Sequence, residues 1–504
     1  MSNKSTKGIW KVISASSMGT MIEWYDFYIF GSLAVVISTK FFPSDNPTAA
    51  FLSTLATFAA GFVVRPFGAL FFGRLGDIIG RKYTFMATLL LMGGATFLIG
   101  CVPSYETIGF FAPLLVLILR LLQGLALGGE YGGAATYVAE HAPVGERGYW
   151  TSWIQTTATV GLFISLMVIL ATKNALSPEE FDNWGWRVPF WISIVMVFVS
   201  YLIRKNMDES PVFAKAKKEG TTSSNPLKDS FGNKYNLKFV LLALFGATMG
   251  QGVVWYTGQF YAMNFMKTVM AIDSSQVDEL LGIALVLGTP FFIFFGWLSD
   301  KIGRKYIMMG GMLLAILLYR PIYKTMYQTT LLSNKVEISE KTKTIVELKK
   351  NKEHALDSIF TLSKEFTDGT VYHEIKTVTL NKEKSNTEIK SIITINSNDK
   401  WLLVFMVFIQ VLFVAMVYGP IAAFLVEMFP VKIRYTSMSL PYHVGNGIFG
   451  GLLPAISTYF VINGKDAGDA EFYLEGLWYP IIIASVCFII GMIYIDNTNK
   501  NKHI

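Results

Sequence analysis

The segment Gly73-Arg-Leu-Gly-Asp-Ile-Ile-Gly-Arg-Lys82 recurs in the second half of the chain as Gly296-Trp-Leu-Ser-Asp-Lys-Ile-Gly-Arg-Lys305. A second signature also occurs twice. It consists of Glu140, Pro143 and Arg147 in the first half and, at the same spacing, of Glu427, Pro430 and Arg434 in the second. Two signatures repeated in the same order indicate two copies of one structural unit. The repeat therefore predicts a chain built from two related halves.

The composition is that of a membrane protein. The 504 residues are 52% hydrophobic and 14% aromatic, and only 16% are charged, against about 25% in soluble domains. Mean hydropathy is +0.43. These values argue against a soluble globular enzyme. The two cysteines, Cys101 and Cys487, lie in apolar runs, so neither a disulfide framework nor a cysteine metal site is expected.

Apolar runs of about 20 residues, the length that crosses a bilayer, predict twelve membrane-spanning helices. Their ranges are 18–38, 50–72, 83–103, 110–139, 150–172, 188–204, 239–263, 278–298, 306–321, 401–427, 436–460 and 475–495. We expect the pair Arg320-Pro321 to end the ninth helix, which is the weakest of the set. Residues 1–17 lack the pattern of a cleavable signal peptide.

The basic residues in short loops predict the orientation. With the N-terminus in the cytoplasm, the loops on that side hold a large excess of Lys and Arg, including Arg74, Arg81, Lys82 and the basic stretch from Arg204 to Lys238. The positive-inside rule therefore predicts that both termini are cytoplasmic. It also accounts for the formal net charge of +7 without a nucleic-acid partner.

The repeat also locates an insertion. Asp77 and Asp300 are 223 residues apart, whereas Glu140 and Glu427 are 287 residues apart, so about 64 extra residues entered the second half. Residues 322–400 are polar, and rough strand alternation at 370–380 and 391–395 predicts a small outer domain with β content; a poorly ordered loop is the alternative. The predicted organisation is an N-terminus at 1–17, a first bundle at 18–204, a linker at 205–238, a second bundle at 239–321 and 401–495 interrupted by the insertion domain at 322–400, and a tail at 496–504.

The repeated loops contain glycines, an acid and a basic pair. Glycine permits the tight turn and the close approach of helices, while an Asp can accept from helix-end N–H groups and an Arg can bind carboxylates or carbonyls. We expect such clusters to latch two helix bundles in one conformation, although a simple positive-inside anchor is the alternative. The candidate gating residues are Gly73, Asp77, Gly80, Arg81, Glu140, Arg147, Asp300, Gly303, Arg304, Glu427 and Arg434.

The two loops, with the segment Arg120-Leu-Leu-Gln-Gly-Leu-Ala-Leu-Gly-Gly-Glu130, resemble the major facilitator superfamily. Further segments resemble its metabolite:proton symporters, a branch with permeases for proline and betaine, α-ketoglutarate, citrate and shikimate. These segments are Glu23-Trp-Tyr-Asp-Phe27, Val64-Arg-Pro-Phe-Gly68, Gly128-Gly-Glu-Tyr-Gly-Gly133 and Glu209-Ser-Pro-Val-Phe213. Two features depart from the family pattern: Ile78 stands where a basic residue is usual, and the insertion is foreign to the better-known members.

Ionisable groups inside a bilayer are costly, so each is a functional candidate. Depth along the predicted helices suggests one pair of Asp26 with Arg120 and a second pair of Arg65 with Glu130. Release of Asp26 from Arg120 would favour its protonation, and the resemblance implies that an acid on the first helix and an arginine on the fourth couple solute to protons. Static ion pairs that join helices are the alternative. Glu23 shares a helix face with Asp26.

The second half contributes aromatic and amide side chains. Gln251, Trp255 and Gln259 form one helical stripe with Tyr256 beside it, which can hold an ammonium group by cation–π contact or a carboxylate by hydrogen bonds; ordinary helix packing is the alternative. His443 lies inside a predicted helix and is either a hydrogen-bonded structural residue or a proton relay. The candidate cavity residues are Glu23, Arg65, Glu130, Tyr131, Gln251, Trp255, Tyr256, Gln259 and His443.

Together these patterns predict an all-α membrane protein of twelve helices in two pseudo-symmetric six-helix bundles, with a small outer insertion of some β content. We expect alternating-access symport of protons and a small carboxylate or zwitterion across a bacterial inner membrane, by a monomer. An uncoupled facilitator or exchanger, or a sensor that uses 322–400, are the alternatives. No catalytic, metal-binding or cofactor motif is recognised, so neither an enzyme nor a metal or cofactor site is expected.

Overall fold

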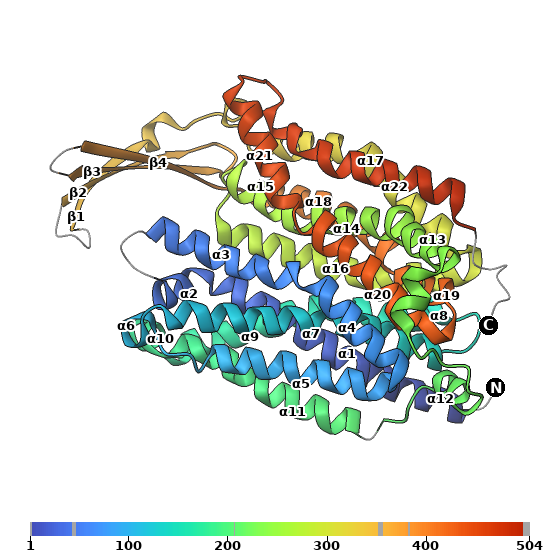
Figure 1. The fold of residues 1–504 in the computed structure, drawn as a ribbon. Coiled ribbons are helices and arrows are strands. Elements are labelled where there is room, and N and C mark those ends of the chain that lie inside the picture. The colour runs from blue at the N-terminus through green and yellow to red at the C-terminus, as the bar shows by residue number, and fades with distance from the viewer. Residues whose placement is uncertain (1–2, 43–46, 206, 351–355, 382–383, 497–504) are drawn as a thin grey trace.

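The computed structural model describes residues 3–42, 47–205, 207–350, 356–381 and 384–496. Long helices run roughly parallel in two groups, and a four-stranded sheet projects from one end (Figure 1). The loops 73–82 and 296–305 lie at the opposite end, which we call the signature end; the other is the sheet end. The predicted tail at 496–504 lies outside the described residues apart from Asp496.

The first half is a bundle whose long helices are interrupted at defined places. The first span bends by 66° between α1 and α2, and the second breaks at Val64 between α3 and α4. The helices of this half are α1 Asn3–Ser32, α2 Ala34–Phe41, α3 Pro47–Val63, α4 Arg65–Ile78, α5 Arg81–Ile99, α6 Tyr105–Ile108, α7 Phe111–His141, α8 Arg147–Gln155, α9 Thr157–Ala175, α10 Pro178–Asn183 and α11 Val188–Lys205.

The linker contributes α12 Pro211–Lys218 and the π-helical turn η2 Lys228–Gly232, both at the signature end. In the second half, the seventh span contains two π-helical turns, and such turns often mark functional sites. The elements of this half are α13 Lys234–Ala243, η3 Leu244–Thr248, α14 Met249–Tyr256, η4 Thr257–Tyr261, α15 Ala262–Thr268, α16 Ser274–Ile302, α17 Arg304–Thr329, α18 Ser397–Tyr418, α19 Ile421–Met428, α20 Arg434–Val444, η8 Gly445–Gly450, α21 Leu453–Asp466, η9 Phe472–Leu477 and α22 Trp478–Tyr494.

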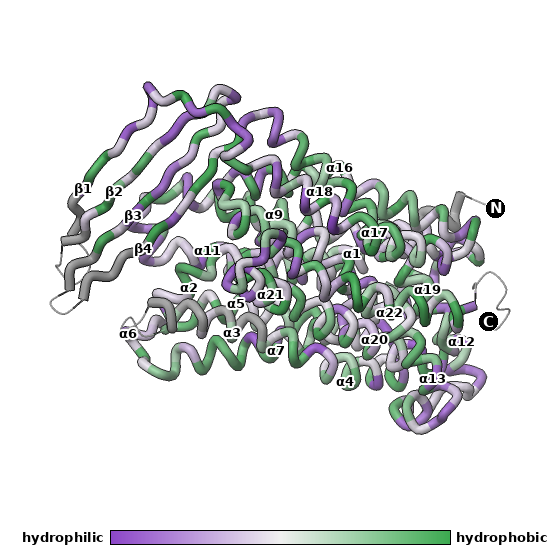
Figure 2. The backbone as a smooth tube through the Cα atoms, turned by 90° about the horizontal axis from the view of Figure 1, so that it is seen from above, coloured by the Kyte–Doolittle hydropathy of each residue, from purple (hydrophilic) through white to green (hydrophobic). Residues whose placement is uncertain are grey.

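Ten helices within the described ranges are long and apolar enough to cross a membrane, and the bent pair α1–α2 makes an eleventh. The remaining predicted span, 50–72, corresponds to the shorter helices α3 and α4. Hydrophobic residues dominate the bundles, whereas the strands alternate hydrophilic with hydrophobic residues (Figure 2). This distribution is that of a helical membrane protein with a polar extension.

The predicted end of the ninth helix at Arg320-Pro321 is wrong. α17 continues through Pro321 to Thr329, because tyrosines on either side of the proline anchor it to the seventh span. Tyr319 donates to the carbonyl of Val254 at 3.2 Å and Tyr323 donates to that of Thr257 at 2.9 Å. Proline is tolerated inside a membrane helix when neighbouring groups hold the backbone in this way.

The insertion contains an antiparallel meander of the strands β1 Lys343–Lys350, β2 Leu356–Glu365, β3 Val371–Asn381 and β4 Lys384–Thr394, in that order. Its base is fixed to the bundle beside α16. Ile393 pairs with Ile272 as an isolated parallel bridge, and the amide of Ile395 donates to the Gln276 side chain at 2.8 Å. The strands that the alternation predicted at 370–380 and 391–395 thus belong to a sheet whose base is hydrogen-bonded to the bundle.

Candidate functional site

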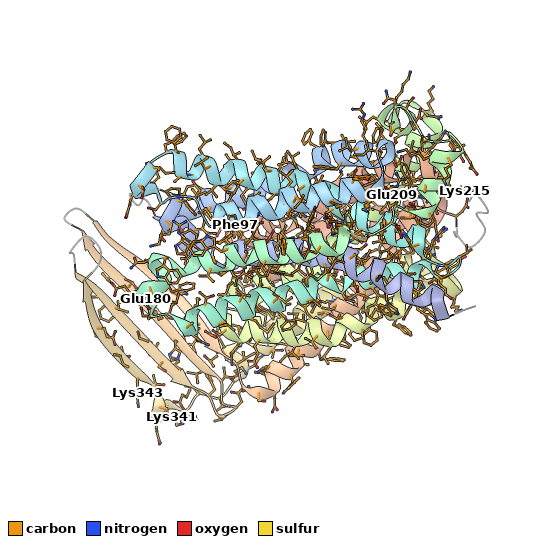
Figure 3. The ribbon with its side chains drawn as sticks, turned by 90° about the horizontal axis from the view of Figure 1, so that it is seen from below. Phe97, Glu180, Glu209, Lys215, Lys341 and Lys343 are labelled. Atoms are coloured by element: carbon orange, nitrogen blue, oxygen red, sulfur yellow. The ribbon has the colours of Figure 1, made fainter. Side chains whose placement is uncertain are left out.

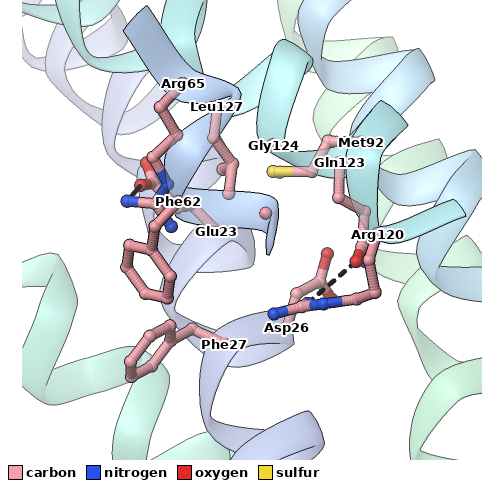
Figure 4. A pocket seen from close by; sticks show the side chains of 11 residues that line it. Glu23, Asp26, Phe27, Phe62, Arg65, Met92, Arg120, Gln123, Gly124 and Leu127 are labelled. Atoms are coloured by element: carbon pink, nitrogen blue, oxygen red, sulfur yellow. Dashed lines mark hydrogen bonds and ion pairs between the residues drawn. The ribbon is translucent and has the colours of Figure 1, made fainter. Parts of the chain in front are cut away.

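A small buried cavity lies among α1, α3, α4, α5 and α7 of the first half (Figure 4). It is lined by Glu23, Asp26, Phe27, Gly61, Phe62, Arg65, Met92, Arg120, Gln123, Gly124 and Leu127. Four charged side chains therefore face one space in an apolar bundle, which is the arrangement expected of a functional site.

Glycines let the helices around this cavity approach closely. A Cβ atom added to Gly124 on α7 would lie 2.9 Å from the carbonyl carbon of Gly61 on α3, and one added to Gly68 would lie 2.7 Å from that of Leu125. Real side chains do not tolerate such contacts with backbone. The glycines of these segments are thus needed to bring α3 and α4 against α7.

A chain of hydrogen bonds connects Asp26 to Arg120. The Thr96 hydroxyl donates to the Asp26 carboxylate, and the Gln123 amide donates to the same hydroxyl at 2.5 Å. Arg120 donates to the Gln123 carbonyl oxygen at 2.9 Å. Asp26 is 4% exposed and Arg120 is 5% exposed, so both ends of the chain are shielded from solvent. The sequence predicted that these two residues act together; Thr96 and Gln123, which connect them, were missed.

The predicted pair of Arg65 with Glu130 is wrong. The Arg65 guanidinium lies 3.8 Å from the Glu23 carboxylate, while Glu130 accepts from Arg204 at 2.7 Å and from Thr88 at 2.7 Å. Glu130 follows Arg120 by ten residues, which turns it about 80° around α7. It therefore faces α5 and α11 rather than the cavity.

Arg204, the last residue of the predicted helix 188–204 and the first of the basic stretch, is buried. It is 1% exposed at the end of α11 and donates to the carbonyls of Ala15 and Phe85 at 3.2 and 2.6 Å. The apolar run before it gave a signal that it belongs to a helix. No pattern in the sequence, however, indicated that this charge turns inward to Glu130.

Aromatic side chains bring the second half against the cavity region. Trp255 lies 5.1 Å from Trp24 between ring centres, and Phe260 lies 5.5 Å from Phe27. Tyr256, also from the predicted stripe, lies 4.9 Å from Trp255. The stripe on the seventh span thus packs against α1, which both the binding and the packing interpretations allow.

The amides of the stripe have different surroundings. Gln251 exchanges two hydrogen bonds with Asn446 of η8, at 2.9 and 3.1 Å, whereas Gln259 is buried at 5% exposure. Asn446 was missed, although it follows His443 in a polar segment of an apolar run. His443 is 2% exposed, and its Nε2 atom has no hydrogen-bond partner within the described part of the chain.

Tyr131 joins the two halves by stacking. Its ring lies 3.7 Å from that of Tyr442 at an interplanar angle of 5°, and its hydroxyl accepts from Gln155 at 2.8 Å. The hydroxyls of Tyr442 and Tyr418 are 2.9 Å apart. The two partner tyrosines were missed, because single aromatic residues in apolar helices are not distinctive in a sequence.

At the signature end, the first repeated loop forms a buried cluster across the two halves. Asp77 lies 2.8 Å from Arg81 and also accepts from the backbone N–H of Thr436, at 2.9 Å, at the start of α20. Arg434 of the second half reaches Glu140 at 3.0 Å, and Arg81 lies 3.7 Å from the same carboxylate. We call Asp77, Arg81, Glu140 and Arg434 the first charge cluster.

The second repeated loop forms the equivalent arrangement. Asp300 accepts from the N–H groups of Gly148 and Tyr149, both at 2.8 Å, at the start of α8. Arg304 binds Asp300 at 2.8 Å and Glu427 through two hydrogen bonds of 2.7 Å, and Arg147 lies 3.9 Å from Glu427. We call Asp300, Arg304, Glu427 and Arg147 the second charge cluster. Each aspartate thus caps a helix of the opposite half.

The glycines of these loops have two roles. Gly80 and Gly303 precede α5 and α17 with φ of 130° and 102°, a conformation that favours glycine. Gly73 and Gly296 lie where helices of opposite halves cross. A Cβ atom on Gly73 would lie 2.9 Å from the Cα of Thr436, and one on Gly296 would lie 2.6 Å from the carbonyl oxygen of Gly148.

The linker covers the first charge cluster. Glu209, labelled at the signature end in Figure 3, accepts from the backbone N–H groups of Arg81 and Lys82 at 3.1 and 3.3 Å. Ser210 donates to Glu140, and the Phe213 ring lies 4.5 Å from the Arg81 guanidinium. The sequence noted this segment as a motif but did not predict its contacts with the loop. Among the described residues, no group of three or more His, Cys, Asp or Glu side chains is placed to hold a metal ion.

Comparison with known proteins places the chain among transporters. The family described as "sugar (and other) transporter" matches residues 11–233, and that described as "MFS/sugar transport protein" matches residues 136–331. The chain is 39% identical over 307 residues to an inner membrane metabolite transport protein of Escherichia coli, covering 59% of this chain and 68% of that protein. It is 28% identical over 492 residues to the α-ketoglutarate permease of the same organism, covering 97% and 94% of the two chains.

Similarity of fold extends to solved structures. A proton:xylose symporter of the major facilitator superfamily matches with a TM-score of 0.69 at 15% identity, over 98% of this chain and 97% of that one. The outward conformation of a second transporter of that superfamily matches with a TM-score of 0.57 at 12% identity, over 95% and 97% of the two chains. The predicted fold of two six-helix bundles is confirmed by these similarities.

Proposed function

We propose that this chain, which belongs to the major facilitator superfamily, carries a small organic carboxylate or zwitterion together with protons. It is a secondary transporter and not an enzyme. The observation that carries the proposal is the buried chain from Asp26 through Thr96 and Gln123 to Arg120. Relatives named as a citrate–proton symporter and a shikimate transporter support the coupling ion and the solute class.

Asp26 is the proposed proton carrier. Its carboxylate has one hydrogen-bonded oxygen, and the other, Oδ1, is buried without a partner among the described residues. A carboxylate in an apolar bundle is stabilised by a nearby arginine, so movement of Arg120 away from it favours protonation. Solute binding that draws Arg120 away thus transfers a proton to Asp26.

The two charge clusters are the proposed gate at the signature end. Both join the halves directly, which supports a gating role at that end. Alternating access requires the contacts at one end to break when the other end closes. Buried ion pairs suit this role, because hydration of the separated charges offsets much of the loss of the pair.

We further propose that both termini are cytoplasmic and that the sheet lies outside an inner membrane. The basic residues of the signature end and the inner membrane relative support this orientation. Lipid and the solute are the proposed partners, and the monomer is the proposed functional unit. A facilitator, an exchanger without coupling and a sensor acting through 322–400 are the alternatives to be tested.

The test is solute-driven proton movement in proteoliposomes with an internal pH dye, with proline, betaine, α-ketoglutarate, citrate and shikimate as solutes. We expect acidification with a transported solute, lost in Asp26→Asn while exchange of labelled solute persists. Glu106→Gln, an exposed acid in the same half, is the matched control. Equilibration of solute without any pH change would establish the facilitator, and binding to 322–400 without flux would establish the sensor.

A further inference from the structure

The charges that line the cavity cancel. Glu23 and Asp26 contribute two negative charges, and Arg65 and Arg120 contribute two positive charges. Glu23, Asp26 and Arg120 are each less than 8% exposed, and the Arg65 side chain is 14% exposed. With all four ionised, the empty site therefore has no net charge.

The neighbouring buried groups do not alter this sum. Between the cavity and the signature end, Glu130 is compensated by Arg204 at 2.7 Å. His443, whose Nε2 atom is buried without a hydrogen-bond partner in the described part of the chain, is counted as neutral. Within the second half, Gln251, Asn446 and the aromatic residues that approach α1 contribute no charge. The site thus behaves as a neutral set of four charges.

An uncompensated charge in an apolar interior is costly, because the protein dipoles and the bilayer replace water poorly. This cost applies to every state in which the cavity is closed to both sides. The empty site with ionised Asp26 is neutral and closes readily. A proton alone leaves one positive charge, and a monovalent anion alone leaves one negative charge. A proton and a monovalent anion together restore neutrality.

We propose that the solute is a monovalent organic anion, a monocarboxylate, carried with one proton in an electroneutral cycle. This rests on the proposed proton symport and adds the charge of the solute. Its carboxylate takes the place of ionised Asp26 as the negative charge beside Arg120, while Asp26 holds the proton. The same sum explains obligate coupling, since either partner alone leaves a net charge in the closed site.

The geometry assigns the carboxylate to Arg120 rather than to Arg65. Arg65 keeps its own counter-charge, because the Glu23 carboxylate lies 3.8 Å away. Protonation of Asp26 removes the negative charge at the far end of the hydrogen-bond chain that begins at Arg120. A planar guanidinium binds a carboxylate through two parallel hydrogen bonds, and Gln123 lies within reach of the same group at 2.9 Å.

The proposal excludes two neighbouring solute classes. A zwitterion such as betaine has no net charge, so its transport with a proton leaves one positive charge in the closed site. A dicarboxylate with one proton leaves one negative charge. Both classes therefore predict a cycle that moves charge, or a different number of protons, in contrast to the electroneutral cycle of a monocarboxylate.

The experiment uses the full chain in proteoliposomes whose pH gradient and membrane potential are set independently with potassium and valinomycin. The probes are shikimate and lactate as monocarboxylates, betaine and proline as zwitterions, and α-ketoglutarate as a dicarboxylate. We expect a monocarboxylate to drive proton uptake and to accumulate with the pH gradient, unaffected by the potential. Proton-coupled uptake that grows with an inside-negative potential would overturn the proposal and leave proton symport standing. Solute flux without proton movement would overturn proton symport itself.

A second measurement tests the charge sum in purified protein. Binding of the transported monocarboxylate should take up one proton per anion, read with a pH indicator in weak buffer. Glu23→Gln adds one positive charge to the cavity, so the anion should bind with little or no proton uptake. Glu106→Gln makes the same chemical change at an exposed site. This variant should still take up one proton per bound anion. Undiminished proton uptake in Glu23→Gln would contradict the proposal.

Discussion

The first and second charge clusters have the same plan but different surroundings. In both, an aspartate caps a helix of the opposite half and binds the arginine four residues later. In the first, Arg81 and Glu140 have fully buried side chains beneath α12, whereas Glu427 of the second has a side-chain exposure of 17%. In the second cluster, Arg304 donates two hydrogen bonds to the Glu427 carboxylate.

This difference shows how one motif is adapted to two positions in the chain. The linker follows only the first half, so Glu209, Ser210 and Phe213 can cover only the first cluster. Buried charges depend more strongly on their partners than exposed ones. We therefore expect removal of a charge to destabilise the first cluster more than the second. The second cluster should depend more on the paired hydrogen bonds between Arg304 and Glu427.

The largest expected effect is that of Asp77→Asn. Among the described residues, the change leaves buried Arg81 with Glu140, at 3.7 Å, as its remaining ion-pair partner. Removal of one partner of a buried pair costs about 3 kcal/mol. Asp300→Asn should cost about 1.5 kcal/mol, because Arg304 keeps both hydrogen bonds to Glu427. Both variants should open the signature end.

The readout is thiol labelling of Ser152→Cys, a buried position between α8 and α16, in protein with Cys101→Ala and Cys487→Ala. Labelling should rise in the order parent, Asp300→Asn, Asp77→Asn. Equal labelling of the two variants would mean that the linker does not distinguish the clusters.

A smaller effect is expected from Arg304→Lys, which tests geometry. Lysine keeps the charge but cannot form the paired hydrogen bonds with Glu427, so we expect a loss of about 2 kcal/mol in the closed conformation. Thermal unfolding and Ser152→Cys labelling measure it. Exposed Lys301→Arg is the control. A variant that behaves as the parent would show that charge alone holds the second cluster.

The sequence predicted the residues of both clusters more fully than the partners around the cavity. Asp77 and Asp300 were found because the motif repeats, and a repeat is visible without a structure. The pairing of Glu130 depended on the rotation of α7 and on the inward turn of Arg204, which spacing does not determine. Thr96 and Gln123 were missed for a related reason, since small polar residues in apolar helices acquire a role only from what packs against them.

A third prediction concerns the cover that only the first cluster has. Glu209→Gln keeps an acceptor for the N–H groups of Arg81 and Lys82 but removes the negative charge at the start of α5. Loss of this helix-end interaction should cost about 0.5–1 kcal/mol, seen as a small rise in Ser152→Cys labelling. Glu219→Gln, on the exposed side of the linker, should have no effect. An equally large rise in labelling in both variants would show that the effect comes from the net charge of the linker and not from the contact of Glu209 with the start of α5.

The smallest effect is expected at the sheet end, where Lys335 lies 2.6 Å from both Asp368 and Asp399. Burial lowers the pKa of Lys335, but the two carboxylates outweigh burial and raise the pKa above its usual 10.5. Burial raises the pKa of Asp368, but hydrogen bonds from Lys335 and Thr370 outweigh it and hold that pKa below 3.8.

The sign of each shift gives the pH window. The stabilisation by Lys335 is complete below its unfolded pKa and is lost as pH rises through the raised folded value, above 10.5. The stabilisation by Asp368 is present above pH 3.8 and is lost as pH falls through the lowered folded pKa of this carboxylate. Hydrogen exchange at 366–371, corrected for intrinsic rates, should therefore be faster in Lys335→Met than in the parent at neutral pH. The difference should shrink as pH falls below 3.8 and vanish once pH is below the lowered folded pKa of Asp368. Exposed Lys341→Met should show no difference from the parent. A difference that persists after Asp368 is protonated would assign the protection to packing of the lysine stem.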